Sequence, residues 1–173
     1  MIVLESVQDY YEHYLRTPND IQGHLPMLRA AARGNVLEIG TRSGISTSAL
    51  LLGVQENGGH LWSSDINDCS SIHFAKPHKQ WSFIHCDSHS VECLISKLGT
   101  MSLDVLLVDG DHSFEGCYQD LAAYGPLAKT IFVHDTECPD TFPGVRQAVE
   151  GFLKVYPRKV SWHKESYGMA VIE

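Results

Sequence analysis

The chain has 173 residues, enough for one domain with a buried core. Its hydrophobic fraction of 43% and charged fraction of 20% are ordinary for a globular protein and exclude a disordered chain. The 21 acidic residues outnumber the 13 basic ones and give a net charge of −8, which argues against nucleic acid as a main partner.

The five cysteines form no Cys-x-x-Cys pair and are odd in number, which favours a reduced, intracellular protein. The first residues turn acidic at once and lack a basic region, so we expect no signal peptide. No apolar run approaches the roughly 20 residues that a membrane span needs. These features predict a cytoplasmic protein that does not bind membranes.

Residues 1–33 are predicted to be helical, with a break at residues 17–20, and we expect them to form a lid over a domain of residues 34–173. In that domain apolar strands alternate with helices, which predicts an α/β fold whose mostly parallel sheet is covered on both faces. Two closing strands lack a helix between them and should form an antiparallel hairpin. The expected strands are 35–39, 60–64, 81–85, 103–108, 130–133, 158–163 and 168–172, and the expected helices run through 49–52, 91–98, 114–124 and 144–156.

The most informative stretch is residues 36–51, where a buried strand, a glycine turn and a helix start follow one another. Gly40 and Gly44 allow a ligand to approach the backbone, and a helix N-terminus offers free amides and a partial positive charge. The hydroxyls of residues 46–48 are predicted to cap this helix. Glu38 lies in the strand just before the turn, where we expect a cationic ligand or ordered backbone amides to compensate its buried charge. The pattern predicts a nucleotide-type site at the first strand-to-helix turn.

The predicted parallel strands all end in polar residues or a glycine turn. Parallel strands bring these ends to one edge, where open α/β sheets bind their ligands. Asp65 ends the second strand, the position of the acid that binds ribose hydroxyls in dinucleotide-binding domains; the alternative is that it only caps a local turn. The strand-end residues are Gly40, Asp65, Asp87, Asp109, His134 and Asp135.

Two segments resemble motifs of class I S-adenosylmethionine (SAM) dependent methyltransferases. Val36-Leu-Glu-Ile-Gly-Thr-Arg-Ser-Gly44 is similar to their first motif, E-x-G-x-x-x-G, and Leu106-Leu-Val-Asp-Gly-Asp-His-Ser-Phe-Glu115 resembles the VDGDHSYE signature of a bacterial group. That group contains small-molecule O-methyltransferases and cephalosporin hydroxylase-like proteins. The resemblance implies a Rossmann-like, doubly wound sheet of seven strands in the order 3-2-1-4-5-7-6, with strand 7 antiparallel. It also implies SAM-dependent methylation of an oxygen of a small molecule.

The resemblance implies that a set of residues contacts SAM along its length, from the amino-acid end to the adenine. Asp109 would lie beside both the methionine moiety and the methyl acceptor. The cofactor-binding residues would be Gly40, Thr41 and Gly44 around the amino-acid end, Glu38 facing it through water or backbone, Asp65 on the ribose, Asp87 on the adenine amino group and Ser88 on the ring edge.

The metal-dependent enzymes of this kind bind a divalent ion after strands four and five, and the matching residues here are Asp109, His134 and Asp135. A hard ion such as Mg²⁺ prefers oxygen ligands, whereas an imidazole shifts the preference toward Mn²⁺, Fe²⁺ or Zn²⁺. Adjacent strand residues point to opposite faces, so His134 and Asp135 can share one ion only if the chain has turned at Asp135. Binding of a metal and its absence both stay open.

His112 falls where metal-dependent catechol-type enzymes carry a lysine base, and an imidazole suits deprotonation of a hydroxyl. The alternative for His112 is helix capping or orientation of a metal, and His134 is the second candidate base. Residues that could line an acceptor pocket, with core packing as the alternative, are Tyr10, Tyr11, Tyr14, Phe142 and Trp162.

Two other functions compete with the enzyme, and the oligomeric state, including a homo-oligomer, is left open. A non-catalytic SAM-binding module would be free to lose the polar residues beyond the cofactor, yet they are present. A nicotinamide dehydrogenase is disfavoured by the lack of a third glycine in the turn and by the closing hairpin.

Overall fold

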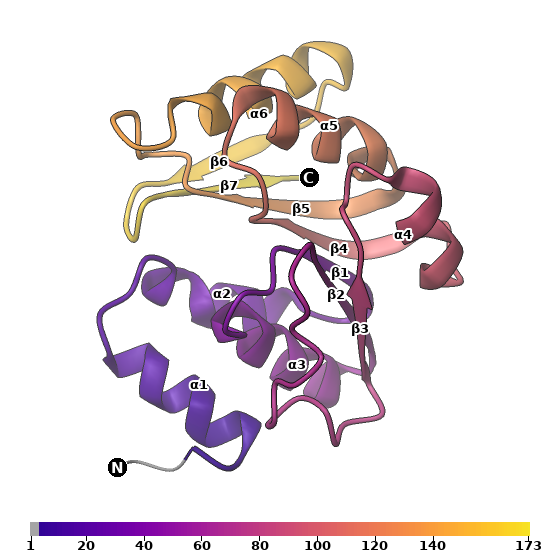
Figure 1. The fold of residues 1–173 in the computed structure, drawn as a ribbon. Helices are drawn as coiled ribbons and strands as arrows, with labels where there is room; N and C mark the ends of the chain where they lie inside the picture. The colour runs from indigo at the N-terminus through magenta and orange to yellow at the C-terminus, as the bar shows by residue number, and fades with distance from the viewer. Residues whose placement is uncertain (1–3) are drawn as a thin grey trace.

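A seven-stranded sheet forms the centre of the computed structural model, which describes residues 4–173 (Figure 1). The strand order is β3-β2-β1-β4-β5-β7-β6; β1 to β5 run parallel, and β7 is antiparallel to β5 and β6. The predicted fold class, strand order and closing hairpin are confirmed. The strands are β1 (Gly34–Ile39), β2 (Gly59–Asp65), β3 (Trp81–His85), β4 (Leu103–Val108), β5 (Ala128–His134), β6 (Val160–His163) and β7 (Met169–Ile172).

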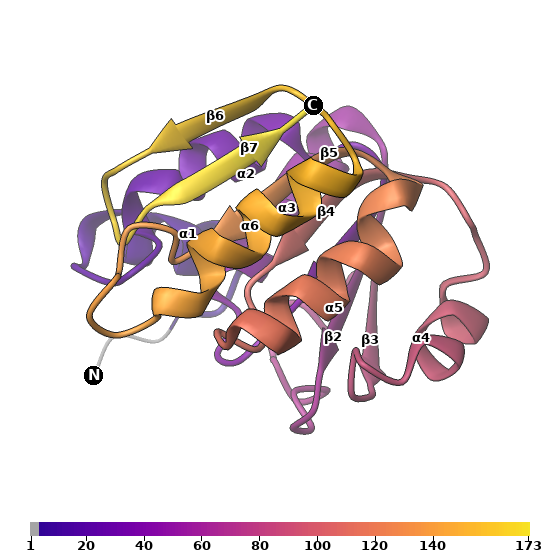
Figure 2. The ribbon, with the colours of Figure 1, turned by 90° about the horizontal axis from the view of Figure 1, so that it is seen from above.

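Helices cover both faces of the sheet (Figures 1 and 2). One layer contains α1 (Val7–Arg16), the short 3₁₀ helix η1 (Gln22–His24), α2 (Leu25–Ala31) and α3 (Ile45–Asn57). The other contains α4 (Val91–Leu98), α5 (Phe114–Tyr124), a 3₁₀ turn η2 (Gly125–Leu127) and α6 (Pro143–Val155). The described part of the N-terminal segment therefore shares a core with α3, and residues 1–3 of that segment lie outside the described residues. None of the helices in residues 4–173 combines the length and apolar character of a membrane span.

Alternation along the strands decides which side chains meet which helices. In β1, Leu37 and Ile39 belong to the core under α4–α6, whereas Val36 belongs to the core under α1–α3. Because side chains alternate between faces, Glu38 points with Val36 toward α3. The same rule sends His134 toward the N-terminal helices, since Phe132 of β5 lies in that core.

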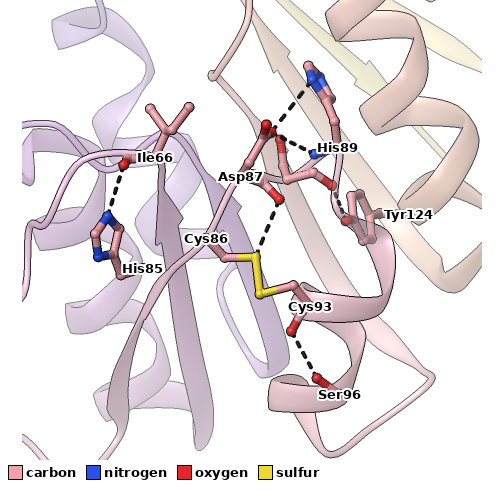
Figure 3. Close-up of a disulfide and its surroundings, with 9 residues drawn as sticks. Ile66, His85, Cys86, Asp87, His89, Cys93, Ser96 and Tyr124 are labelled. Carbon is pink, nitrogen blue, oxygen red and sulfur yellow. Dashed lines mark hydrogen bonds and ion pairs between the residues drawn. A yellow bond between two sulfur atoms is a disulfide. The ribbon is translucent and has the colours of Figure 1, made fainter.

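A disulfide joins Cys86, just after β3, to Cys93 in the first turn of α4 (Figure 3). The prediction of a fully reduced protein is wrong for this pair. The chain reverses between β3 and α4 and brings the two Cα atoms to 6.7 Å, within the range of a disulfide, and a spacing of seven residues does not reveal this. The three other cysteines, Cys69, Cys117 and Cys138, are buried and free.

Candidate functional site

A cavity of about 630 Å³ lies at the carboxyl ends of β1 to β4. Residues from far apart in the sequence line it together, as the parallel topology predicts. The predicted cofactor residues among its lining are Gly40 after β1, Asp65 at the end of β2, Asp87 and Ser88 after β3, and Asp109 after β4. Arg42 and Ile66, for which the sequence predicts no role, also line the cavity.

The glycine turn after β1 closely approaches the end of β4. Gly40 has φ +91°, and a Cβ atom there would lie 2.0 Å from the carbonyl oxygen of Asp109. Only glycine allows this backbone approach and conformation. Gly44, at φ +89°, is the N-cap of α3 and shapes the turn without lining the cavity.

Asp65 holds the glycine turn while bordering the cavity. Its Oδ2 accepts hydrogen bonds from the backbone amides of Thr41 and Arg42, each 2.9 Å long, and its Oδ1 accepts one of 2.8 Å from the backbone amide of Asn67. Burial raises the pKa of the Asp65 carboxyl, but these amides outweigh it and hold the pKa below its usual value. Asp65 thus caps the turn, but its position on the cavity leaves open whether it only does so, and the ribose assignment stays a prediction.

Glu38 is fully buried and does not line the cavity. Its carboxylate accepts hydrogen bonds from the hydroxyls of Ser46 (2.6 Å), Thr47 (2.7 Å) and Ser63 (2.5 Å). The expected compensation by a cationic ligand or backbone amides is wrong, because Glu38 faces the first turn of α3 and the middle of β2. Burial raises the pKa of the Glu38 carboxyl to about 7 against the opposing effect of the hydroxyls.

The same hydrogen bonds overturn the predicted cap of α3. Ser46 and Thr47 use their hydroxyls on Glu38, and the Ser48 hydroxyl donates to the carbonyl of Ile45. No side chain of the described chain caps α3, so its first amides remain available to a ligand.

The loop after β3 is fixed from two sides (Figure 3). The Tyr124 hydroxyl donates to the carbonyl oxygen of Ser88, and the Asp87 carboxylate accepts a 3.0 Å hydrogen bond from the backbone amide of His89. The disulfide at Cys86 ties the start of this loop to α4. Asp87 is about half exposed, and its side chain borders the cavity.

Asp109, His134 and Asp135 form a cluster whose ligand atoms all lie within 4.8 Å of one another. His134 Nδ1 lies 3.2 Å from Asp109 Oδ1 and 3.4 Å from Asp135 Oδ2. Asp135 has φ +63°, so the chain has turned directly after β5 and both residues face one point. The geometric condition stated for a shared ion is met.

The backbone fixes the orientation of the His134 ring. Its Nε2 lies 3.2 Å from the carbonyl oxygen of Asp20 and 3.0 Å from that of Ser166, so Nε2 carries a hydrogen and donates it. Nδ1 is thereby aimed at the carboxylates. Burial lowers the pKa of His134, but Asp109 and Asp135 outweigh it and raise the pKa to about 11.

His112 completes the cluster. Its Nε2 lies 3.4 Å from Asp109 Oδ1 and 3.1 Å from Asp135 Oδ2, and its ring packs on Phe142 with centroids 4.2 Å apart. The hydrogen bond with Asp109 raises the pKa of His112, against the effect of burial. The cap of α5 is Ser113 and not His112, because the Ser113 hydroxyl accepts a hydrogen bond from the backbone amide of Gly116.

A second cavity of about 540 Å³ adjoins the first, and His112 and Phe142 line both. Of the five aromatic residues predicted as acceptor-pocket candidates, only Phe142 lines either cavity. Tyr10 and Tyr11 are buried in the core, and Tyr14 and Trp162 pack against it.

The model of a protein family described as "Methyltransferase domain" matches residues 37–136, more than half of the chain. The chain belongs to this methyltransferase family. Its strand order, with an antiparallel β7, is that of the class I enzymes, so the protein is a SAM-dependent methyltransferase and SAM is its cofactor. No curated protein matches the chain in sequence.

Solved structures of other methyltransferases share the fold at low sequence identity. The SAH-bound Podospora anserina methyltransferase PaMTH1 has a TM-score of 0.66 at 14% identity, over 99% of this chain and 88% of that chain. The Bacillus cereus O-methyltransferase in complex with SAH has a TM-score of 0.61 at 16% identity, over 96% and 90%. MycE from the mycinamycin biosynthetic pathway, in complex with Mg, SAH and mycinamycin VI, has a TM-score of 0.66 at 17% identity, over 97% of this chain and 54% of that chain. This chain thus spans about half the length of MycE.

Proposed function

We propose that the protein methylates a hydroxyl oxygen of a small molecule, with a divalent cation held by Asp109, His134 and Asp135. The observation that carries this proposal is the convergence of these three residues with His112, because Asp109 and His112 line the cofactor cavity and His134 and Asp135 lie directly behind them. A methyltransferase that only transferred a methyl group to an already reactive nucleophile would need no such cluster.

The cavity fits SAM by shape and by charge. Gly40 lets the turn pack against the backbone just after β4 while bordering the cavity, and the strand-end carboxylates of Asp65 and Asp87 face the space for adenosine. Hydroxyl groups of a ribose are good partners for an ionised carboxylate. We therefore assign the ribose to Asp65 and the adenine edge to Asp87 and Ser88, while Glu38 supports the turn from behind.

The acidic and imidazole donors fit a cation. Asp135 Oδ1 is buried and has no hydrogen-bond partner within residues 4–173, and two carboxylates face His134 Nδ1 at hydrogen-bond distance. A donor set of one imidazole nitrogen and two carboxylate oxygens suits Mn²⁺, Fe²⁺ or Zn²⁺ better than Mg²⁺. When bound, such an ion lowers the pKa of an acceptor hydroxyl and fixes its oxygen.

The residues of the chain then have separate tasks. SAM already carries an activated methyl group, so alignment of the acceptor oxygen with the methyl carbon and exclusion of water are the main requirements. His112 lies between the two cavities and accepts the acceptor's proton as the oxygen takes the methyl group, leaving S-adenosylhomocysteine. The acceptor occupies the second cavity, against Phe142 and Phe114.

The N-terminal segment acts as the lid in this proposal. Residues 17–24, here called the strap, connect α1 to α2, and the carbonyl of Asp20 lies on the His134 ring. Gly23 and His24 bond to the loop between β6 and β7, through Ser166 Oγ at 2.9 Å and the carbonyl of Glu165 at 2.8 Å. The strap thus covers the cation site on the side away from His112.

The test combines calorimetric titration with a search for turnover. The wild-type protein should bind SAM and S-adenosylhomocysteine but not NAD, and it should methylate members of a panel of phenols and sugar hydroxyls. His112→Ala should lower turnover about 100-fold or more while SAM affinity stays near wild type, because His112 is proposed to act on the acceptor's proton. Equal turnover would remove His112 from the mechanism. Binding of SAM without turnover on any acceptor would favour the non-catalytic module.

A further inference from the structure

A third cavity of about 250 Å³ continues the cofactor cavity toward the N-terminal helices. The two cavities share Gly40, Arg42 and Asp109. Asp20 and its neighbours in the strap line one wall of this cavity. The glycine turn and the first residues of α3 line the opposite wall. One end of the cleft is therefore formed by a segment that is remote from the sequence motifs.

Opposite charges face each other across this small cavity. Arg42 Nη1 lies 3.5 Å from Asp20 Oδ2, and the two side chains are 75% and 37% exposed. An ion pair as exposed as this contributes little to the stability of the fold. Either side chain can therefore take a new partner at small cost in stability.

Both residues are held in place by their backbones rather than by this pair. The amide of Arg42 donates to Asp65 at 2.9 Å, and the residue has φ +46°, a conformation that the turn imposes. The carbonyl of Asp20 accepts a hydrogen bond from His134. The two charged groups thus stand at defined points on opposite walls, one fixed to the cofactor site and the other to the cation site.

The ligand that matches this arrangement is the amino-acid end of SAM, an α-ammonium and an α-carboxylate on one carbon. We infer that Asp20 binds the α-ammonium and that Arg42 binds the α-carboxylate. The uncapped first turn of α3 lines the same cavity and adds free amides and a partial positive charge on the carboxylate side. Four alternating charges then form a ring in which the Asp20–Arg42 pair need not be fully broken.

The inference rests on SAM being the cofactor and assigns a residue of the strap to cofactor recognition. Its consequence is selectivity: the site distinguishes the complete cofactor from adenosine derivatives that lack the amino-acid end. That end would also bridge the strap and the glycine turn, which form opposite walls of the cavity.

Calorimetry with three ligands separates the two charges. S-adenosylhomocysteine carries both groups, its decarboxylated analogue only the ammonium, and 5′-methylthioadenosine neither. Asp20→Asn should weaken binding of the first two ligands about 10-fold or more, and Arg42→Gln should weaken only the first, because a charged hydrogen bond is lost in each case. Affinity for 5′-methylthioadenosine should stay within about twofold in both variants.

Arg16→Gln is the matched control, since it breaks another exposed ion pair, Arg16–Glu12, on α1 and should change none of the three affinities. Equal losses for all three ligands would show that the strap only supports the fold, and unchanged affinity for S-adenosylhomocysteine would also overturn the inference. Failure of the wild-type protein to bind any of the ligands would instead overturn the cofactor assignment on which the inference rests.

Discussion

The two halves of the cleft treat their buried carboxylates differently. On the β1–β2 side, Glu38 accepts three hydroxyl hydrogen bonds and Asp65 accepts bonds from three backbone amides. On the β4–β5 side, Asp109 and Asp135 face two imidazoles, and the buried carboxylate oxygen Asp135 Oδ1 has no partner in the described part of the chain.

This difference separates carboxylates that hold the backbone from carboxylates that are available to a ligand. A carboxylate whose oxygens are fully engaged fixes the backbone around it, so the glycine turn is formed before the cofactor arrives. Unpartnered buried oxygens are costly and persist where a ligand completes them. The β1–β2 side is thus a preformed cofactor support, and the β4–β5 side is the part that a cation and an acceptor complete.

Asp65→Ala gives the largest expected effect on the cofactor side. The turn loses its acceptor and the ribose loses its charged partner, so affinity for S-adenosylhomocysteine should fall about 10²- to 10⁴-fold in calorimetry. Asp68→Ala, which removes an exposed acid that bonds only the amide of Ser70, should keep wild-type affinity. Retained binding in Asp65→Ala would end the ribose assignment.

Glu38→Gln tests whether the buried carboxyl group on the β1–β2 side contributes to the stability of the fold. The pKa of Glu38 is raised from 4.5 to about 7 in the folded state, so the folded protein binds its proton more tightly than the unfolded chain does. The contribution of Glu38 to the free energy of unfolding should therefore fall by about 3 kcal/mol as pH rises from about 4.5 through 7. In urea titrations at pH 5 and pH 8, the wild-type protein should lose most of this free energy relative to Glu38→Gln. The exposed Glu92→Gln should retain the wild-type pH dependence, and parallel curves for Glu38→Gln and wild type would contradict the argument.

His134→Ala tests the cation site on the β4–β5 side, and the measurement does not require the methyl acceptor to be known. Loss of an oriented imidazole ligand should weaken Mn²⁺ binding about 100-fold in calorimetry. His78→Ala serves as the control, because His78 is half-buried and bonds to Gln55 rather than to the cluster. Should wild type and His134→Ala bind Mn²⁺ equally, the cluster is an ion-pair network and the metal proposal fails.

The smallest effect is expected at the loop after β3. Cys93→Ser removes the bond to Cys86, and a cross-link over so short a loop contributes about 2 kcal/mol to the free energy of unfolding. Thiol titration of the denatured wild-type protein should find three reactive cysteines before reduction and five after it. Five thiols before reduction would show that the two cysteines are unlinked.

Much of the fold could be predicted from the sequence because its apolar runs end at clear breaks. The bounds of β3, β4, α4 and α5 agree to the residue with the predicted ones, since glycine, aspartate or serine flanks most of these segments. The parallel order then brought Asp65, Asp87 and Asp109 to one cavity, as the strand-end rule requires.

Contacts between distant elements could not be predicted. The partners of Glu38 depend on the rotation of α3 about its axis above β1, which no local pattern records. Asp20 lies in a connection without a motif, and only the packing of the strap brings it to Arg42 and His134. The pairing of Cys86 with Cys93 likewise depends on how the chain reverses after β3.

One imidazole joins the beginning and the end of the described chain. The Nε2 atom of His134 meets carbonyl groups of Asp20 and Ser166, while its Nδ1 atom belongs to the cation site. Thermodynamic linkage requires that whatever stabilises one orientation of this ring also stabilises the docked strap, and the reverse. The rate of amide hydrogen exchange along residues 20–24 should therefore depend on whether a cation is bound at Asp109, His134 and Asp135.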